Sequence, residues 1–207
     1  MKKFLFTLLA LASFSLINAQ ENSTRFGAKA GLNISNLTGE GADLIRAKTN
    51  VGFHVGAVVE IPISENFAFQ PELVYSNQGA EIDFPGLEAS SIINYINIPL
   101  IAKYYIAQGF SLQAGPQISI LVSAEDTAEG SIDTGFGVIN IEETEDARDD
   151  YKTIDVGLNF GLGYQLEFGM FFDARYNLGL SNILDEDLFG DLDLKNSVFQ
   201  ISLGYKF

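Results

Sequence analysis

Residues 154–166 read IDVGLNFGLGYQL and alternate strictly between two kinds of side chain. One set is apolar throughout: Ile154, Val156, Leu158, Phe160, Leu162, Tyr164 and Leu166. The positions between them hold Asp155, Asn159, Gln165 and three glycines. Because successive side chains of a β-strand point to opposite faces, this stretch predicts a strand with one apolar face and one small, polar face.

The same alternation recurs in seven other segments, at 25–34, 51–61, 67–76, 96–106, 110–122, 172–180 and 199–207. No residue of the eight apolar faces carries a charge. The predicted connections alternate between short (62–66, 107–109, 167–169) and long (36–50, 77–92, 123–151, 181–196). Strands of about ten residues with this rhythm of connections are typical of outer-membrane barrels. We therefore predict an all-β fold, an eight-stranded antiparallel up-and-down transmembrane β-barrel.

The composition of the polar face decides which way this barrel faces. That face is rich in glycine and short amides, whereas a strand face in water would normally carry many long charged side chains. Tyrosines lie towards the strand ends of the apolar face, where an aromatic girdle sits in a membrane barrel: Tyr75, Tyr104, Tyr164, Tyr176 and Tyr205. The apolar face is therefore predicted to contact lipid. A soluble, lipocalin-like binder is the alternative, and solubility without detergent would favour it.

The N-terminus has the features of an export signal. Lys2 and Lys3 precede an apolar run over 4–17, and Ala19 supplies a small residue at the expected cleavage site. We predict a signal peptide at 1–19 and the barrel domain at 20–207. Export and an even number of strands together predict an outer-membrane location with both termini in the periplasm.

Composition excludes several classes of function. The chain has no cysteine and a single histidine, so neither a Cys-ligated metal site nor a His-cluster zinc site is expected. Its net charge is -15, which disfavours nucleic-acid binding because that function needs a basic surface. No cofactor is predicted, and nucleic acid is not an expected partner.

Four stretches of the sequence resemble a known family. They are Asn18-Ala19-Gln20, the opening strand 26–33, the segment 95–100 followed by Lys103, and the closing 203–207. Together they resemble the PorT-like outer-membrane β-barrel family of Bacteroidetes, over nearly the whole exported chain. The resemblance implies fold and location, and links only the family's namesake to protein secretion. It also implies that Tyr205 and Phe207 form the signal read by the barrel-assembly machinery.

The inner face of the predicted barrel carries charges of both signs. The side chains that we predict to form a structural polar network in the lumen are Lys29, His54, Glu60, Glu72, Lys103, Asp173 and Arg175. Buried charges persist only when they are paired, and the lumen of an eight-stranded barrel is just filled by side chains. A narrow pore, or a barrel associated with transport or secretion, is the alternative. His54 is expected inside, beside Glu60, without the Ser and Asp partners of a catalytic group, so no enzymatic activity is predicted.

The long connections are the expected site of function. Residues 123–151 hold ten acidic residues against Arg148 alone, and five more acidic residues lie in 181–196. We expect a structural or interaction role for these acidic extracellular loops, with envelope proteins or divalent cations as partners besides outer-membrane lipid. Asp185, Asp187 and Gly190 follow part of an EF-hand pattern, but Phe189 and Asn196 stand where that loop needs Asp or Asn and Glu. No metal site is therefore assigned.

Overall fold

The computed structural model describes residues 23–40, 42, 47–84, 87–133, 138–185 and 192–207. The predicted signal peptide at 1–19 lies outside the described residues, as does most of the partial EF-hand pattern. The strands are β1 (Arg25–Thr38), β2 (Ala47–Pro62), β3 (Phe67–Phe84), β4 (Leu87–Ala107), β5 (Phe110–Asp133), β6 (Val138–Asp146), β7 (Ile154–Gln165), β8 (Met170–Gly179) and β9 (Lys195–Lys206). A short 3-10 turn, η2 (Arg148–Asp150), follows β6.

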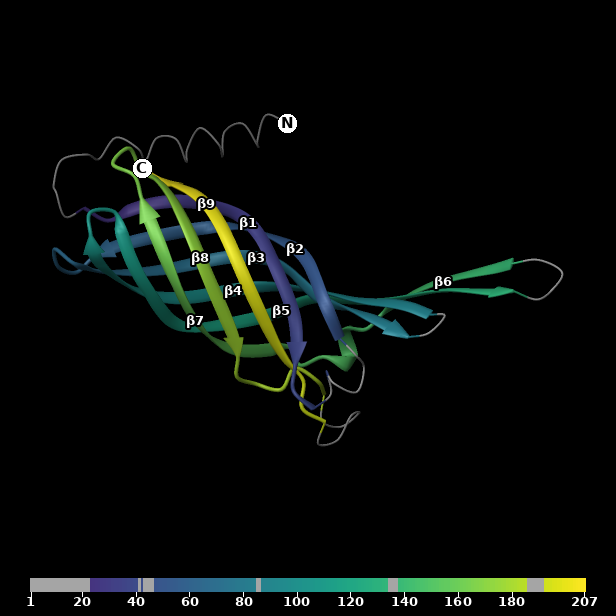
Figure 1. Cartoon of the computed structure of the whole chain (residues 1–207). Helices are drawn as coiled ribbons and strands as arrows, with labels where there is room; N and C mark the ends of the chain where they lie inside the picture. Colours follow the sequence, from purple (N-terminus) through teal and green to yellow (C-terminus); the bar gives the residue numbers. More distant parts are fainter. Residues whose placement is uncertain (1–22, 41, 43–46, 85–86, 134–137, 186–191) are drawn as a thin grey trace, which may run out of the picture.

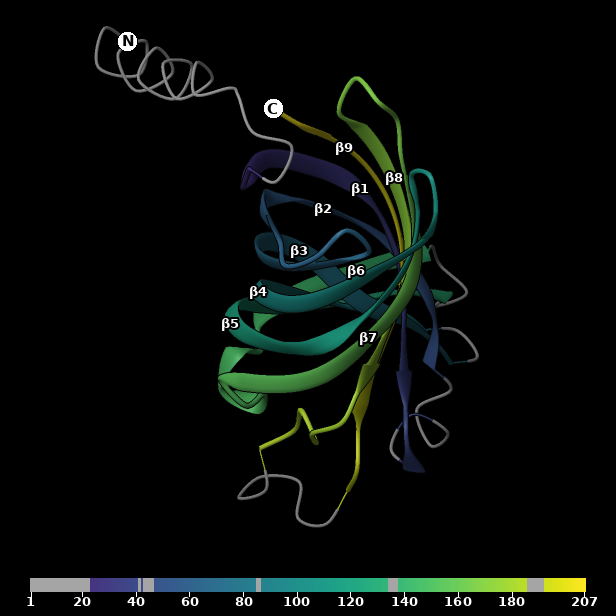
Figure 2. The same cartoon turned by 90° about the vertical axis from the view of Figure 1, so that its left-hand side faces the viewer.

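Eight of these strands close into a barrel (Figure 2). The hydrogen-bonded order is β4-β3-β2-β1-β9-β8-β7-β5, and β4 pairs with β5 to complete the ring. Every neighbouring pair is antiparallel, for example Ala30↔Val55 between β1 and β2 and Ala30↔Leu203 between β1 and β9. The predicted closed, eight-stranded up-and-down barrel is confirmed. Closure leaves no barrel strand with an unpaired edge facing lipid.

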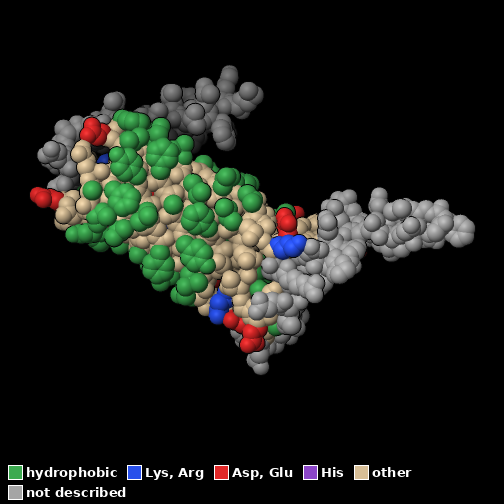
Figure 3. Space-filling model, viewed as in Figure 1, with side chains coloured by type: hydrophobic (Ala, Val, Ile, Leu, Met, Phe, Trp, Pro, Cys, Tyr) green, Lys and Arg blue, Asp and Glu red, His purple; other side chains and the backbone are tan. Residues whose placement is uncertain are grey.

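A broad band of hydrophobic side chains covers the barrel wall that Figure 3 shows. Large side chains such as Phe53, Leu73 and Ile201 are more than half exposed, at 51%, 56% and 52%. A water-soluble protein rarely exposes so broad an apolar area, whereas a lipid-facing wall requires it. Among the described residues, no helix is long and apolar enough to cross a membrane.

Two of the predicted long loops are wrong. The chain between 77 and 92 continues β3 as far as Phe84 and starts β4 at Leu87, and the chain after Ser123 continues β5 to Asp133 and then forms β6. These extensions pair with one another, through Ala80↔Ser91, Leu87↔Gly130 and Gly130↔Ile141. They form a sheet that projects far beyond the barrel (Figure 1). Outside the lipid neither face needs to be apolar, so the alternation that marks a membrane strand is lost there.

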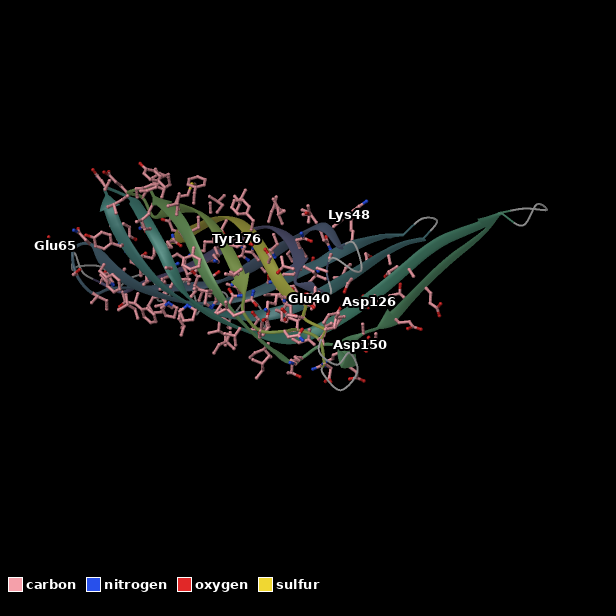
Figure 4. All side chains as sticks on the ribbon, turned by 60° about the horizontal axis from the view of Figure 1, so that its bottom comes forward. Glu40, Lys48, Glu65, Asp126, Asp150 and Tyr176 are labelled. Atoms are coloured by element: carbon pink, nitrogen blue, oxygen red, sulfur yellow. The ribbon has the colours of Figure 1, made fainter. Side chains whose placement is uncertain are left out.

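The two ends of the barrel differ. The end with short turns holds Glu65 and the C-terminus. The projecting sheet, with Asp126, and the turn η2, with Asp150, lie at the other end (Figures 1 and 4). At the latter end the inward side chains form an apolar cluster: Leu37, Ala42, Ala80, Ile93, Tyr95, Leu121, Ala124, Ala147, Tyr151, Ile183, Leu184 and Leu194. This cluster was not predicted, and its buried members pack together at the end of the barrel that carries the projecting sheet.

Candidate functional site

Glycines of the inner wall make room for long polar side chains. Gly31 of β1 is paired with His54 on β2 and with Ser202 on β9. A Cβ at position 31 would lie 2.0 Å from the Ile201 carbonyl oxygen and 2.7 Å from Cε1 of His54. The imidazole therefore lies directly over the glycine and reaches across β1 to the far strand.

His54 is held between two short polar side chains. Its Nδ1 lies 2.8 Å from Oδ1 of Asn33, and its Nε2 lies 2.8 Å from Oγ of Ser202. The expected position beside Glu60 is wrong, because Glu60 makes its contacts with other residues nearer the short turns. Both side chains have the inward parity of β2, but six residues along one strand separate them by about 20 Å, so they lie at different depths in the lumen.

The order Ser202, His54, Asn33 matches the order of hydroxyl, base and orienting group in nucleophilic enzymes. Exposure argues against that chemistry here. Asn33, His54 and Ser202 are 0%, 1% and 2% exposed, so neither lipid nor dissolved substrate reaches the hydroxyl. The group is a hydrogen-bonded part of the lumen.

A compact ionic group occupies the middle of the barrel. Glu72 contacts two cations, with Oε2 2.5 Å from Nζ of Lys29 and Oε1 2.8 Å from Nη2 of Arg175. The same guanidinium nitrogen lies 3.0 Å from Oδ2 of Asp173. Gln113 completes the group: it accepts from Nε of Arg175 at 2.6 Å and donates to Oδ1 of Asp173 at 2.6 Å. Two cations and two anions balance, as buried charges require.

A second group centres on Glu60 near the short turns. Its Oε2 accepts from Nζ of Lys206 at 2.5 Å, from Nζ of Lys103 at 3.2 Å and from the hydroxyl of Tyr105 at 2.8 Å. Arg25 reaches Oε1 from the rim at 3.1 Å, with its side chain 42% exposed. The ring of Phe171 lies 4.5 Å from Nζ of Lys206, which adds a cation–π contact.

The structure thus places all seven predicted network residues inside the barrel, each with an exposed fraction of 4% or less. It brings Lys29, Glu72, Asp173 and Arg175 into one group, puts Glu60 and Lys103 in the second, and leaves His54 apart from both. Tyr105 and Phe171 were not singled out from the sequence. Tyr105 has the inward parity of β4 and could have been found on that ground. Within the described parts of the chain, no group of three or more acidic, His or Cys side chains is placed to hold a metal ion.

The hairpin of β5 and β6 carries acidic residues directly opposite one another. Glu125 pairs with Asp146, and Asp126 pairs with Glu145. Burial raises the pKa of Asp126 above its usual value, and the nearby Asp150 carboxylate adds to this, against a hydrogen bond with Ser91. Opposed like charges destabilise a pair of strands, so this hairpin is electrostatically strained.

The base of the projecting sheet is anchored to the apolar cluster. The Tyr151 hydroxyl lies 2.8 Å from Oγ of Ser91, and burial raises the pKa of Tyr151 to about 12. Tyr151 also forms a β-bridge with Leu184. The segment after β6, the segment before β9 and the wall of the barrel are therefore held together.

A family model described as "Outer membrane protein beta-barrel domain" matches residues 18–185. The chain belongs to this family. Membership in the outer membrane protein beta-barrel domain family agrees with the closed barrel and its lipid-facing wall, and it identifies the protein as a small outer-membrane barrel.

Solved structures similar to this family member share its fold at low sequence identity. The attachment invasion locus protein Ail of Yersinia pestis is 13% identical over 89% of this chain and 99% of its own, with a TM-score of 0.50. Neisserial surface protein A is 13% identical over the same shares, with a TM-score of 0.51. At this level of identity the likeness extends to the fold alone. No curated protein matches the sequence.

Proposed function

We propose that this outer-membrane barrel acts at the cell surface as an interaction protein, with the projecting acidic sheet of β3 to β6 as its working part and the barrel as its anchor. The observation that carries the proposal is the sheet itself, which extends well beyond the lipid-facing wall and bears exposed acidic residues such as Glu143 and Glu145 (Figure 1). A barrel that only filled space in the membrane would not need such an extension. In this orientation the short turns and both termini lie in the periplasm.

The closed lumen supports an interaction role over transport. The two ionic groups cross the interior, and the apolar cluster covers the end beneath the sheet. A narrow pore, the alternative function, would need both to move aside. The sealed surroundings of His54 likewise support a role without catalysis.

The finer family assignment is also a proposal. The segment with Asn97, Pro99 and Lys103 and the closing Tyr205 and Phe207 support a PorT-like barrel of Bacteroidetes type. In that view the C-terminal strand is the segment recognised by the barrel-assembly machinery. β9 forms the seam with β1, and Tyr205 and Phe207 both point outward, 48% and 56% exposed.

Site-directed labelling of intact cells tests the orientation. Because the chain has no cysteine, Glu145→Cys and Gln108→Cys each give a single reporter at opposite ends of the molecule. We expect a membrane-impermeant maleimide to label position 145 on whole cells, and position 108 only after the outer membrane is permeabilised. Labelling of position 108 alone on intact cells would show that the protein has the opposite orientation in the membrane and would overturn the proposed surface role.

A further inference from the structure

The outermost strand of the projecting sheet has one open side. In the described residues β6 pairs with β5 alone, whereas β5 is also paired with β4 along its extension (Figure 1). A strand with one unpaired side presents a row of N–H and C=O groups that another extended chain can bind. Over Val138–Asp146 this row is roughly 30 Å long.

The register shows which backbone groups face the open side. The Ala147 N–H donates to the Ala124 carbonyl at 3.0 Å, and the ladder continues from there in register. Residues of an antiparallel strand alternate between bonding their partner and pointing away from it. Glu145 and Glu143 therefore bond β5, whereas Asp146 and Thr144 direct their N–H and C=O groups to the open edge.

Charge decides which chain fits that edge. Glu143, Glu145 and Asp146 are exposed beside it, and the hairpin already carries opposed acidic pairs. A second copy of β6, paired in parallel register or antiparallel about Thr144, would place acidic residues against acidic residues, which is unfavourable across strands. A basic strand would instead relieve the repulsion. A metal ion is disfavoured, since the described acidic side chains form no group placed to ligate one.

One face of the same sheet also offers space for side chains. A depression of about 250 Å³ is lined by Ala89 and Ser90 of β4, by residues 126–128 of β5, and by Glu143 and Glu145 of β6. Residues of an added strand opposite positions 143 and 145 would put their side chains on this face. Long basic side chains would reach the two glutamates and the depression beyond them.

We propose that the open edge of β6 binds an extended basic segment of a partner protein, which adds a strand to the sheet and pairs its Lys or Arg side chains with Glu143 and Glu145. This inference rests on the proposed surface role and names the class of partner. Main-chain hydrogen bonds supply the pairing, and the two glutamates select the charge of the bound segment.

The test uses the full exported chain folded in detergent micelles and three fluorescent peptides of about ten residues, the length of a typical added strand. The first alternates Lys and Val, the second alternates Glu and Val, and the third is the Lys peptide with alternate backbone amides N-methylated. Fluorescence anisotropy measures binding at fixed ionic strength. We expect the Lys peptide to bind and the other two to bind at least about tenfold more weakly, because they lack the charge or the main-chain donors.

Protein variants locate the site. Thr144→Pro removes an N–H that faces the open edge and keeps the main-chain hydrogen bonds to β5, although it loses the side-chain hydrogen bond with Thr127. It should weaken Lys-peptide binding about tenfold. Glu143→Gln with Glu145→Gln should weaken it to a similar extent, since two exposed ion pairs together contribute up to about tenfold. Glu65→Gln with Glu167→Gln removes the same charge from the short turns at the opposite end and should leave binding unchanged. Heat-modifiable migration on gels shows that each variant is folded.

The outcomes separate the possible occupants. Equal binding of the N-methylated peptide, or full binding to Thr144→Pro, would overturn strand addition. Complete displacement by millimolar Mg²⁺ would point to a cation site instead, and a concentration-dependent dimer abolished by Thr144→Pro would make a second copy the occupant. If the Lys peptide does not bind but position 145 is labelled on intact cells, strand addition alone is refuted. If position 108 is labelled instead, the proposed surface role, on which this inference rests, is refuted.

Discussion

Glu72→Gln is expected to destabilise the barrel strongly, because Glu72 is the anion shared by two buried cations. Its carboxylate contacts Lys29 at 2.5 Å and Arg175 at 2.8 Å, and all three side chains are at most 1% exposed. Glutamine keeps the shape but removes the charge, which leaves Asp173 as the only anion beside both cations in this group. Removing one partner of a buried ion pair typically costs about 3–5 kcal/mol.

The double variant Glu72→Gln with Lys29→Met gives the matched control. In this double variant the group again has equal numbers of cations and anions, because Arg175 keeps its contact with Asp173. We expect the double variant to recover at least about 2 kcal/mol relative to the sum of the two single variants, within the range of coupling for residues in contact. The free energy of unfolding is measured by urea titration of the barrel folded in lipid vesicles. A cost below about 1 kcal/mol for Glu72→Gln, or simple additivity of the two substitutions, would refute a charge-balanced lumen.

Four further predictions follow from other parts of the molecule. Gly31→Ala should cost about 1–3 kcal/mol in the same titration, because its Cβ would meet the Ile201 carbonyl at 2.0 Å; an unchanged stability would contradict the close packing of His54. Asp126→Asn should slow amide hydrogen exchange in β5 and β6 at neutral pH. Since the folded pKa of Asp126 is raised, the wild-type hairpin is most stable when this group is protonated and loses stability as pH rises through the folded pKa, so the difference should vanish in acid. Planar-bilayer recordings should show no discrete conductance. Regular single-channel steps would instead support the alternative function, a narrow pore. Phe207→Ala should lower the amount of barrel inserted in cells without impairing folding into detergent in vitro, whereas equal insertion would count against its role as an assembly signal.

The alternation of residues along the chain predicts much of the barrel because lipid imposes it. In β7, Val156 and Leu158 must face the acyl chains, so a period of two is visible in the sequence. Beyond the membrane this constraint ends. The extension of β5 carries Glu125 and Asp126 side by side, and nothing in its pattern separates a strand from a loop.

Strand parity likewise predicts which side chains enter the lumen but not which ones meet. Lys29 of β1 reaches Glu72 of β3 across β2, and Arg175 reaches Glu72 from β8. Such contacts depend on the stagger of eight strands around the ring, which no single strand encodes. The apolar cluster was missed for a related reason. Its members come from several strands and from the connections between them, such as Leu121 inside β5 and Ile183 after β8, and only the assembled ring brings them together.

The apolar cluster has a consequence for how such a protein can change over generations. Tyr151, Ile183 and Leu194 hold the segments beneath the projecting sheet against the wall of the barrel, so substitutions there would lower the yield of folded protein. Glu143 and Glu145 of β6 are exposed and are not members of that cluster. Under the proposed surface role, selection from outside the cell acts on these exposed positions of β6 while the buried cluster stays the same, so one barrel can acquire new binding partners and still fold.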